Sequence, residues 1–123
     1  MSQTHKIIAW IAAALLIAGI LPAGVLKLIG NQQMIQLFAA VGFGQWFRYF
    51  TGILEVGGCI LILLPATAFW AAGVLACVMA GAIVTHVRLM LPNIITPISL
   101  LAIALVILWL RRPHRNVSSG QPN

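Results

Sequence analysis

This 123-residue sequence is poor in charge, and poorest in acid: it contains one Glu, no Asp and seven Lys or Arg residues. A soluble chain of this size with so few charged side chains would have almost no solvating surface. A single acid also excludes carboxylate dyads, and no Ser-His-Asp set or phosphate-binding loop is present. Hydrolytic chemistry is therefore not expected, and the sequence assigns no catalytic residue.

Cysteines are scarce as well, and Cys59 and Cys77 define neither a metal site nor a redox compartment. They lack CxxC spacing and have no Cys or His nearby at the intervals that metal ligands need. Both lie inside apolar runs, so we expect two small buried hydrophobic side chains. Their positions leave open a disulfide between neighbouring helices.

Hydrophobic residues make up 62% of the chain, which favours the lipid bilayer as its main solvent. Four apolar runs predict an all-α fold, a four-helix transmembrane bundle in a single domain of residues 1–110. At about 1.5 Å per residue, the first run is long enough to cross a hydrocarbon core of about 30 Å. Its length and the lack of a clear A-x-A site argue against a cleaved signal peptide. The four predicted spans are residues 7–29, 48–64, 68–89 and 94–110.

The segment between the first two spans differs from the spans themselves. From residue 31 to residue 45, apolar side chains recur at near-helical spacing while Asn and Gln supply a polar side. This pattern predicts a short helix lying in the membrane interface. We expect Gly42 and Gly44 to end that helix, Pro65 to stop the second span, and Asn93 to cap the fourth.

Small residues also recur at steps of four along the third span. Gly73, Cys77 and Gly81 form a stripe that predicts close approach of a neighbouring helix.

Tryptophan and basic residues mark the predicted ends of the spans. Tryptophan favours the membrane–water interface, and each of the four lies within a few residues of a predicted end. The positions are Trp10, Trp46, Trp70 and Trp109.

Basic residues flank both termini, which an even number of spans places on the same side of the membrane. These residues are Lys6, Arg111, Arg112 and Arg115, and the positive-inside rule therefore predicts that both termini are cytoplasmic. We expect a bacterial inner (plasma) membrane, with residues 111–123 as a polar cytoplasmic tail. A nucleic-acid partner is not expected despite the net charge of +6, because the basic residues lie at the ends of apolar runs.

Three titratable residues lie at similar depth in the predicted outer half of the spans. Glu55, the only acid, lies about 10 Å below the boundary at a helical rise, His86 about 9 Å and Lys27 about 5 Å. An ionisable side chain inside a span costs several kcal/mol unless it is paired or hydrated, so each one needs a partner. Thr51 shares the face of Glu55, and Arg48 lies close by on the same span. We therefore predict one polar cluster opening outward.

Two interpretations of this cluster remain open. Lys27 and Glu55 can form a structural ion pair that locks the first two spans, or they can bind a ligand head group. His86 can serve as a hydrogen-bond partner between helices or exchange protons near neutral pH. The ligand-binding candidates are Lys27, Glu55, His86, Thr51 and Arg48, and no metal ligands are identified.

Five short motifs occur in an order that resembles the DoxX-like membrane proteins over residues 7–110. The motif with the most weight is Gly52-Ile-Leu-Glu55-Val-Gly57-Gly58. The others are Gly24-x-x-Lys27-Leu28, Gly42-Phe-Gly-Gln-Trp46-Phe, Leu64-Pro65 and Met79-x-Gly81-Ala82-x-x-x-His86.

The resemblance implies a four-helix membrane bundle with Lys27 and Glu55 at positions where the family has a Lys and a Glu. Some family members are linked to redox complexes, including a thiosulfate:quinone oxidoreductase subunit and a mycobacterial oxidoreductase assembly. We therefore expect a small subunit of a membrane redox system whose outer-half pocket binds a quinone-like or lipid head group. The expected partners are the bilayer and a redox protein or further copies of the chain, and quinone is the cofactor that the resemblance suggests.

Two other functions compete with this expectation. The chain can be a non-enzymatic scaffold or assembly factor, with the stripe of Gly73, Cys77 and Gly81 facing a partner helix. A small-molecule transporter is the third interpretation. The chain has only four predicted spans and no internal repeat, which weakens the transporter interpretation. A dimer would compensate for the small number of spans.

Overall fold

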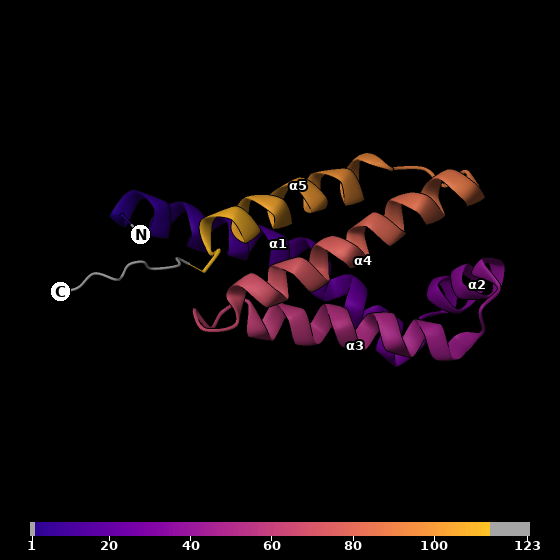
Figure 1. Ribbon diagram of the computed structural model, residues 1–123. Coiled ribbons are helices and arrows are strands. Elements are labelled where there is room, and N and C mark those ends of the chain that lie inside the picture. Colours follow the sequence, from indigo (N-terminus) through magenta and orange to yellow (C-terminus); the bar gives the residue numbers. More distant parts are fainter. Residues whose placement is uncertain (1, 114–123) are drawn as a thin grey trace.

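The computed structural model describes residues 2–113, and these residues form helices and short connections without any strand (Figure 1). The predicted all-α class is confirmed. Predictions about residues 1 and 114–123, including Arg115 and most of the polar tail, lie outside the described residues. The helices are α1 (Gln3–Ile29), α2 (Gln32–Val41), α3 (Gln45–Leu61), α4 (Ala68–Leu89) and α5 (Ile95–Leu110).

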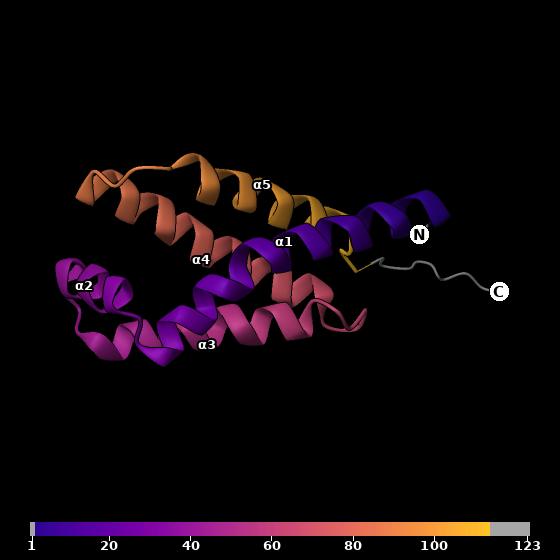
Figure 2. The same cartoon turned by 180° about the vertical axis from the view of Figure 1, so that it is seen from behind.

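Four of the helices lie side by side, and the short α2 lies at one end (Figures 1 and 2). The most extensive contacts join α4 to α5 and α1 to α3, while α1 also packs on α5 and α3 on α4. The start of α1 and the end of α5 lie at the same end of the molecule as the α3–α4 connection. At the opposite end, α2 faces the end of α4 and the connection to α5.

Two helices, α1 and α4, are long and apolar enough to cross a membrane. The other two predicted spans correspond to shorter helices, α3 with 17 residues and α5 with 16. Large apolar side chains are exposed along all four, from Ile11 on α1 to Leu105 on α5. Such a surface suits a lipid environment better than water.

The boundaries of the second predicted span were wrong by three residues at each end. Helix α3 begins at Gln45 and ends at Leu61. Pro65 stands four residues after Leu61 and has no N–H to donate to its carbonyl, which agrees with its predicted role in ending the helix. The helix gives way to a turn in which the Thr67 hydroxyl donates to the Leu61 carbonyl at 2.7 Å. The same carbonyl accepts from the Leu64 amide at 3.2 Å, so both of its donors come from the turn after the helix.

Asn93 does not cap α5, contrary to the prediction. The helix is preceded by Ile94 and has no side-chain cap. Asn93 adopts a left-handed backbone conformation with φ of 63°, which Asn tolerates better than most residues. It therefore turns the chain between α4 and α5.

The expected short helix is present as α2, with tighter bounds. Its first turn is capped by Asn31, whose side chain accepts from the Gln33 amide at 3.1 Å. It ends at Gly42, as predicted, with a left-handed φ of 93°. Gly44 does not end α2 but precedes the first residue of α3.

Glycines allow the long helices to approach closely, but these are not the glycines that the sequence pattern predicted. A Cβ atom on Gly58 would lie 2.7 Å from Leu75, and one on Gly19 would lie 2.5 Å from Leu100. These sites join α3 to α4 and α1 to α5. By contrast, a Cβ on Gly81 would have no neighbour within 4 Å, and Gly73 offers only ordinary contact. The predicted stripe on α4 therefore mediates no close approach among the described residues.

The two cysteines occupy different environments. Cys59 is buried in the core as expected, whereas Cys77 is exposed on α4, so the prediction that both are buried was wrong. Both are free thiols, and no disulfide joins them. The apolar core is centred on Leu16, Ile20, Leu75 and Ile107, which are fully buried.

Candidate functional site

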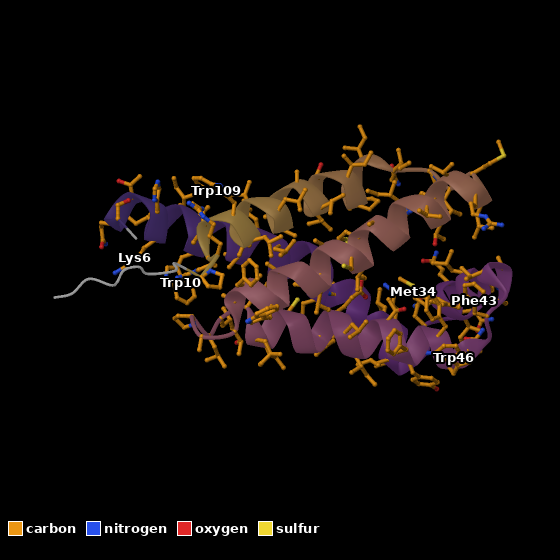
Figure 3. All side chains as sticks on the ribbon, in the orientation of Figure 1. Lys6, Trp10, Met34, Phe43, Trp46 and Trp109 are labelled. Carbon is orange, nitrogen blue, oxygen red and sulfur yellow. The ribbon has the colours of Figure 1, made fainter. Side chains whose placement is uncertain are left out.

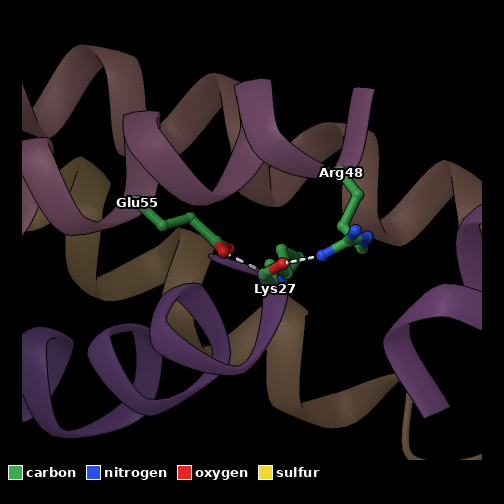
Figure 4. A network of polar contacts seen from close by, with 3 residues as sticks. All are labelled: Lys27, Arg48 and Glu55. Carbon is green, nitrogen blue, oxygen red and sulfur yellow. Dashed lines mark hydrogen bonds and ion pairs between the residues drawn. The ribbon is translucent and has the colours of Figure 1, made fainter. Parts of the chain in front are cut away.

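Lys27 and Glu55 form the ion pair that the sequence suggested. The Lys27 Nζ atom lies 2.8 Å from Glu55 Oε1, joining the last turn of α1 to the middle of α3 (Figure 4). Only 8% of Lys27 and 2% of Glu55 are exposed. The pair is therefore sealed within the helix packing and does not line an open pocket.

Two glycines bring these charges together. A Cβ atom on Gly24 would lie 3.0 Å from the Glu55 Cβ, and one on Gly52 would lie 3.1 Å from the Lys27 Cβ. Both distances are tighter than side chains normally allow. The absence of side chains at Gly24 and Gly52 lets α1 and α3 approach until the ammonium and the carboxylate meet.

The two charged groups lie close together, but their hydrogen-bond geometry is imperfect. Glu55 Oε1 receives no well-aligned hydrogen bond from the described residues, although the Lys27 ammonium is its nearest charged neighbour. Most of the stabilisation must therefore be Coulombic, which is strong in a low-dielectric interior. Removing either partner would leave the other charge buried and alone.

Arg48 extends this cluster towards the end of α1. Its Nη1 donates to the Lys27 carbonyl (Figure 4). Its Nε donates to the Gln45 Oε1 at 2.7 Å. The Lys27 carbonyl lies in the final turn of α1, where no intrahelical donor is available and the helix dipole favours a cation. Arg48 is only 4% exposed. Its charge therefore stabilises the end of α1 and is not accessible to an external ligand.

Gln45 links the same cluster to α2. Its Nε2 donates to the Ile35 carbonyl at 3.0 Å while its Oε1 accepts from Arg48. One chain of polar contacts thus runs from α1 through Arg48 and Gln45 to α2. The position of α2 is therefore tied to the buried cluster.

His86 does not join Lys27 and Glu55, contrary to the predicted single cluster. No hydrogen bond or ion pair connects it to either residue. Its Nδ1 lies 2.8 Å from the Ala82 carbonyl, one turn earlier on α4. A carbonyl oxygen can only accept, so this contact requires a proton on Nδ1 and leaves Nε2 free to accept in the neutral ring.

His86 instead lines a groove between α2 and the end of α4, with a volume of about 630 Å³. Met34, on the α2 wall, lies at this end of the molecule (Figure 3). The glutamines Gln33 and Gln36 supply amide groups along the same wall, and their side chains make no hydrogen bond to other described residues. The apolar part of the groove comes from Met34, Leu37, Ala40, Leu89, Leu91 and Pro92.

The remaining candidate, Thr51, lies half-buried on α3 one turn from Glu55, and its hydroxyl makes no hydrogen bond to the described residues. Sequence reasoning missed the roles of Gln33, Gln36 and Gln45. The polar side of residues 31–45 was recognised, but its orientation towards α4 depends on how the chain folds back.

Comparison with known families places the chain in a group of membrane proteins. The model of the DoxX-like family covers residues 11–108, which include all of α2, α3 and α4 and most of α1 and α5. The chain belongs to the DoxX-like family. No curated protein and no solved structure matches this DoxX-like chain.

Proposed function

We propose that this DoxX-like chain is a four-span integral membrane protein that serves as a small subunit of a membrane redox system. Its groove between α2 and α4 holds a quinone-like or lipid head group. The observation that carries the proposal is the convergence of His86, Gln33 and Gln36 on one open groove whose other walls are apolar. A few polar groups in a mainly apolar concavity are typical of ligand sites.

The arrangement of helices supports the membrane placement. Two helices meet the length and apolarity needed to span a bilayer, and exposed apolar side chains cover the outer surface. Tryptophans gather at both ends, with Trp10 and Trp109 at one and Trp46 at the other (Figure 3). This distribution is typical of side chains at membrane interfaces.

The chemistry of the groove fits a quinone better than a charged metabolite. Quinone oxygens accept hydrogen bonds, and the amide groups of Gln33 and Gln36 can donate them. The flat ring has apolar contact surface in Met34, Leu37 and Leu89. No carboxylate or buried cation in the groove would select a charged ligand.

His86 adds the capacity to move a proton. Reduction of a quinone to a quinol consumes two electrons and two protons, and the electrons come from a partner oxidoreductase. A protonated His86 can donate from Nε2 to a quinone oxygen, and the neutral ring can accept a proton back. The contact of Nδ1 with Ala82 holds the ring in one orientation for this exchange.

Lys27, Glu55 and Arg48 have a supporting role in this proposal. Their charged groups contact one another or the backbone, and none lines the groove. They hold α1, α3 and α2 in the arrangement that forms the α2 wall.

Quinone binding is tested by solvent extraction and mass spectrometry of the purified protein, followed by titration with a short-chain benzoquinone. We expect His86→Phe, or the pair Gln33→Leu and Gln36→Leu, to weaken binding by about tenfold per lost hydrogen bond. Arg88→Gln, an exposed change on α4, is the matched control and should bind normally. Unchanged affinity in His86→Phe contradicts the proposed site.

The subunit role is tested separately in cells. Quinone-linked redox activity of membranes from a strain lacking this chain should fall, and the wild-type gene should restore it. Unchanged activity would rule out the redox role even if the purified protein binds a quinone.

The second candidate function is a membrane scaffold, and the outward face of α4 favours it. Cys77 is exposed, and Gly81 has open space where a Cβ would be. Crosslinking from Cys77 in native membranes discriminates the two functions, because a scaffold captures one specific partner chain at this face.

A further inference from the structure

A second groove lies on the opposite half of the molecule, between α1 and α5, and it is unrelated to the groove at His86. Its volume is about 230 Å³. Every residue that lines it is apolar: Ile8, Ile11, Ala12, Leu15, Ile103 and Val106. A groove with no polar group suits a hydrocarbon chain.

A basic and aromatic surface lies next to this groove, at the end where the two helices carry the chain termini. We call Lys6, Trp10, Trp109, Arg111 and Arg112 the basic end. Lys6, Trp10 and Trp109 are seen together there in Figure 3. The Arg112 guanidinium lies 4.3 Å above the Trp109 ring, and that of Arg111 lies 5.4 Å from the Trp10 ring.

The cations of the basic end have no acidic side chain to pair with. Glu55 is the only acid in the chain, and it is buried against Lys27 in the other half of the molecule. The arginines contact aromatic rings, and Arg112 Nη1 also donates to the Trp109 carbonyl. These contacts restrain the two side chains, but no acidic side chain neutralises them. An external anion would complete this surface.

The groove and the basic end are spaced as the parts of a phospholipid are. Val106 precedes Arg111 by five residues, a rise of about 7.5 Å along the helix axis, and Ile8 follows Lys6 by two residues, about 3 Å. A phosphate held at the helix ends would therefore place the first part of an acyl chain alongside the groove.

We infer that the α1–α5 face is a binding site for an anionic phospholipid, with the phosphate at the basic end and an acyl chain in the groove. The site takes a lipid of the phosphatidylglycerol class in preference to a zwitterionic lipid, because the nearby cations attract net negative charge. The inference rests on the membrane placement in the proposed function, but not on quinone binding.

Native mass spectrometry of the full-length protein, titrated with phosphatidylglycerol or with phosphatidylcholine of the same acyl chains, tests the site. Wild type should retain phosphatidylglycerol preferentially. The preference should fall roughly fivefold for each cation removed in Arg111→Gln and Arg112→Gln. Arg88→Gln removes an exposed charge at the other end of the bundle and should leave the preference unchanged.

The groove is tested by filling it. Ile11→Trp places a bulky side chain at an exposed groove position and should reduce retention of both lipids, whereas Val84→Trp, at a similarly exposed position on α4, should not. Circular dichroism confirms that each variant is folded.

Three results would overturn the inference. They are equal retention of the two lipids by wild type, an unchanged preference in the double arginine variant, and full competition by millimolar inorganic phosphate, which would remove any role for the groove. Quinone extracted from the same samples keeps the two proposals separate. A preference for phosphatidylglycerol without bound quinone supports this site and counts against the α2–α4 site alone.

Discussion

The buried cluster and the α2–α4 groove contain similar kinds of side chain but use them in opposite ways. Lys27, Glu55 and Arg48 direct their charged groups towards one another and towards a helix end. In the groove, the Gln33 and Gln36 amides and the His86 Nε2 make no hydrogen bond to a described residue. Polar groups that are paired internally hold a fold together, whereas convergent groups without partners are available for a ligand.

The largest expected effect comes from breaking the ion pair. Glu55→Ala leaves the Lys27 ammonium buried without its partner and should cost about 3–5 kcal/mol of folding free energy. Unfolding of the purified protein in detergent measures the loss. The double variant Lys27→Met and Glu55→Leu replaces both charges with apolar groups and should recover most of the stability. If the single variant is as stable as wild type, the pair is not structural.

A smaller loss is expected when α1 and α3 are pushed apart. A Cβ on Gly52 would lie 2.9 Å from Leu28, so Gly52→Ala should destabilise the protein by about 1–3 kcal/mol through overpacking. Gly57→Ala is the control on the same helix, because its Cβ would have no neighbour within 4 Å. Equal stability of the two variants would show that the tight contact at Gly52 does not matter.

Substitution of Arg48 tests whether the buried cluster and the α2–α4 groove are coupled. Arg48→Gln removes the donors to Lys27 and Gln45 and should cost about 1.5–3 kcal/mol, as expected for hydrogen bonds from a charged group. Hydrogen exchange should then quicken in the amides of α2, and quinone affinity should fall with it. Unchanged exchange in α2 would show that this helix is held by its apolar contacts alone.

The smallest effect on stability is expected in the groove itself. His86→Phe keeps the ring packing but loses the contact with Ala82, so stability should change by no more than about 0.5 kcal/mol. Thermal unfolding of His86→Phe and of Glu55→Ala measures the difference in stability between the two variants. A destabilisation as large as that of Glu55→Ala would make His86 part of the structural core.

The ion pair could be predicted because the sequence offers little choice. A chain with one acid, placed inside an apolar helix, needs a cation at similar depth, and Lys27 is in reach on the preceding span. The helices themselves followed from long apolar runs. The close contacts at Gly24 and Gly52 could not be assigned, because any of 11 glycines can allow two helices to approach.

The position of His86 could not be predicted for a geometric reason. Spacing along a helix fixes the depth of a side chain, but not which neighbour the helix turns it towards. His86 and Glu55 share a predicted depth, yet His86 faces α2 while Glu55 faces α1. The same limit explains why Cys77 was expected to be buried and is exposed.

The separation of Lys27 and Glu55 along the chain matters for how the protein is made. Synthesis proceeds from the N-terminus, so the first helix reaches the bilayer before the helix that carries the carboxylate exists. During that interval residues 1–54 offer no acid that could neutralise the Lys27 ammonium. In the proposed membrane placement, the long side chain of Lys27 can reach the hydrated interface until the third helix supplies the carboxylate.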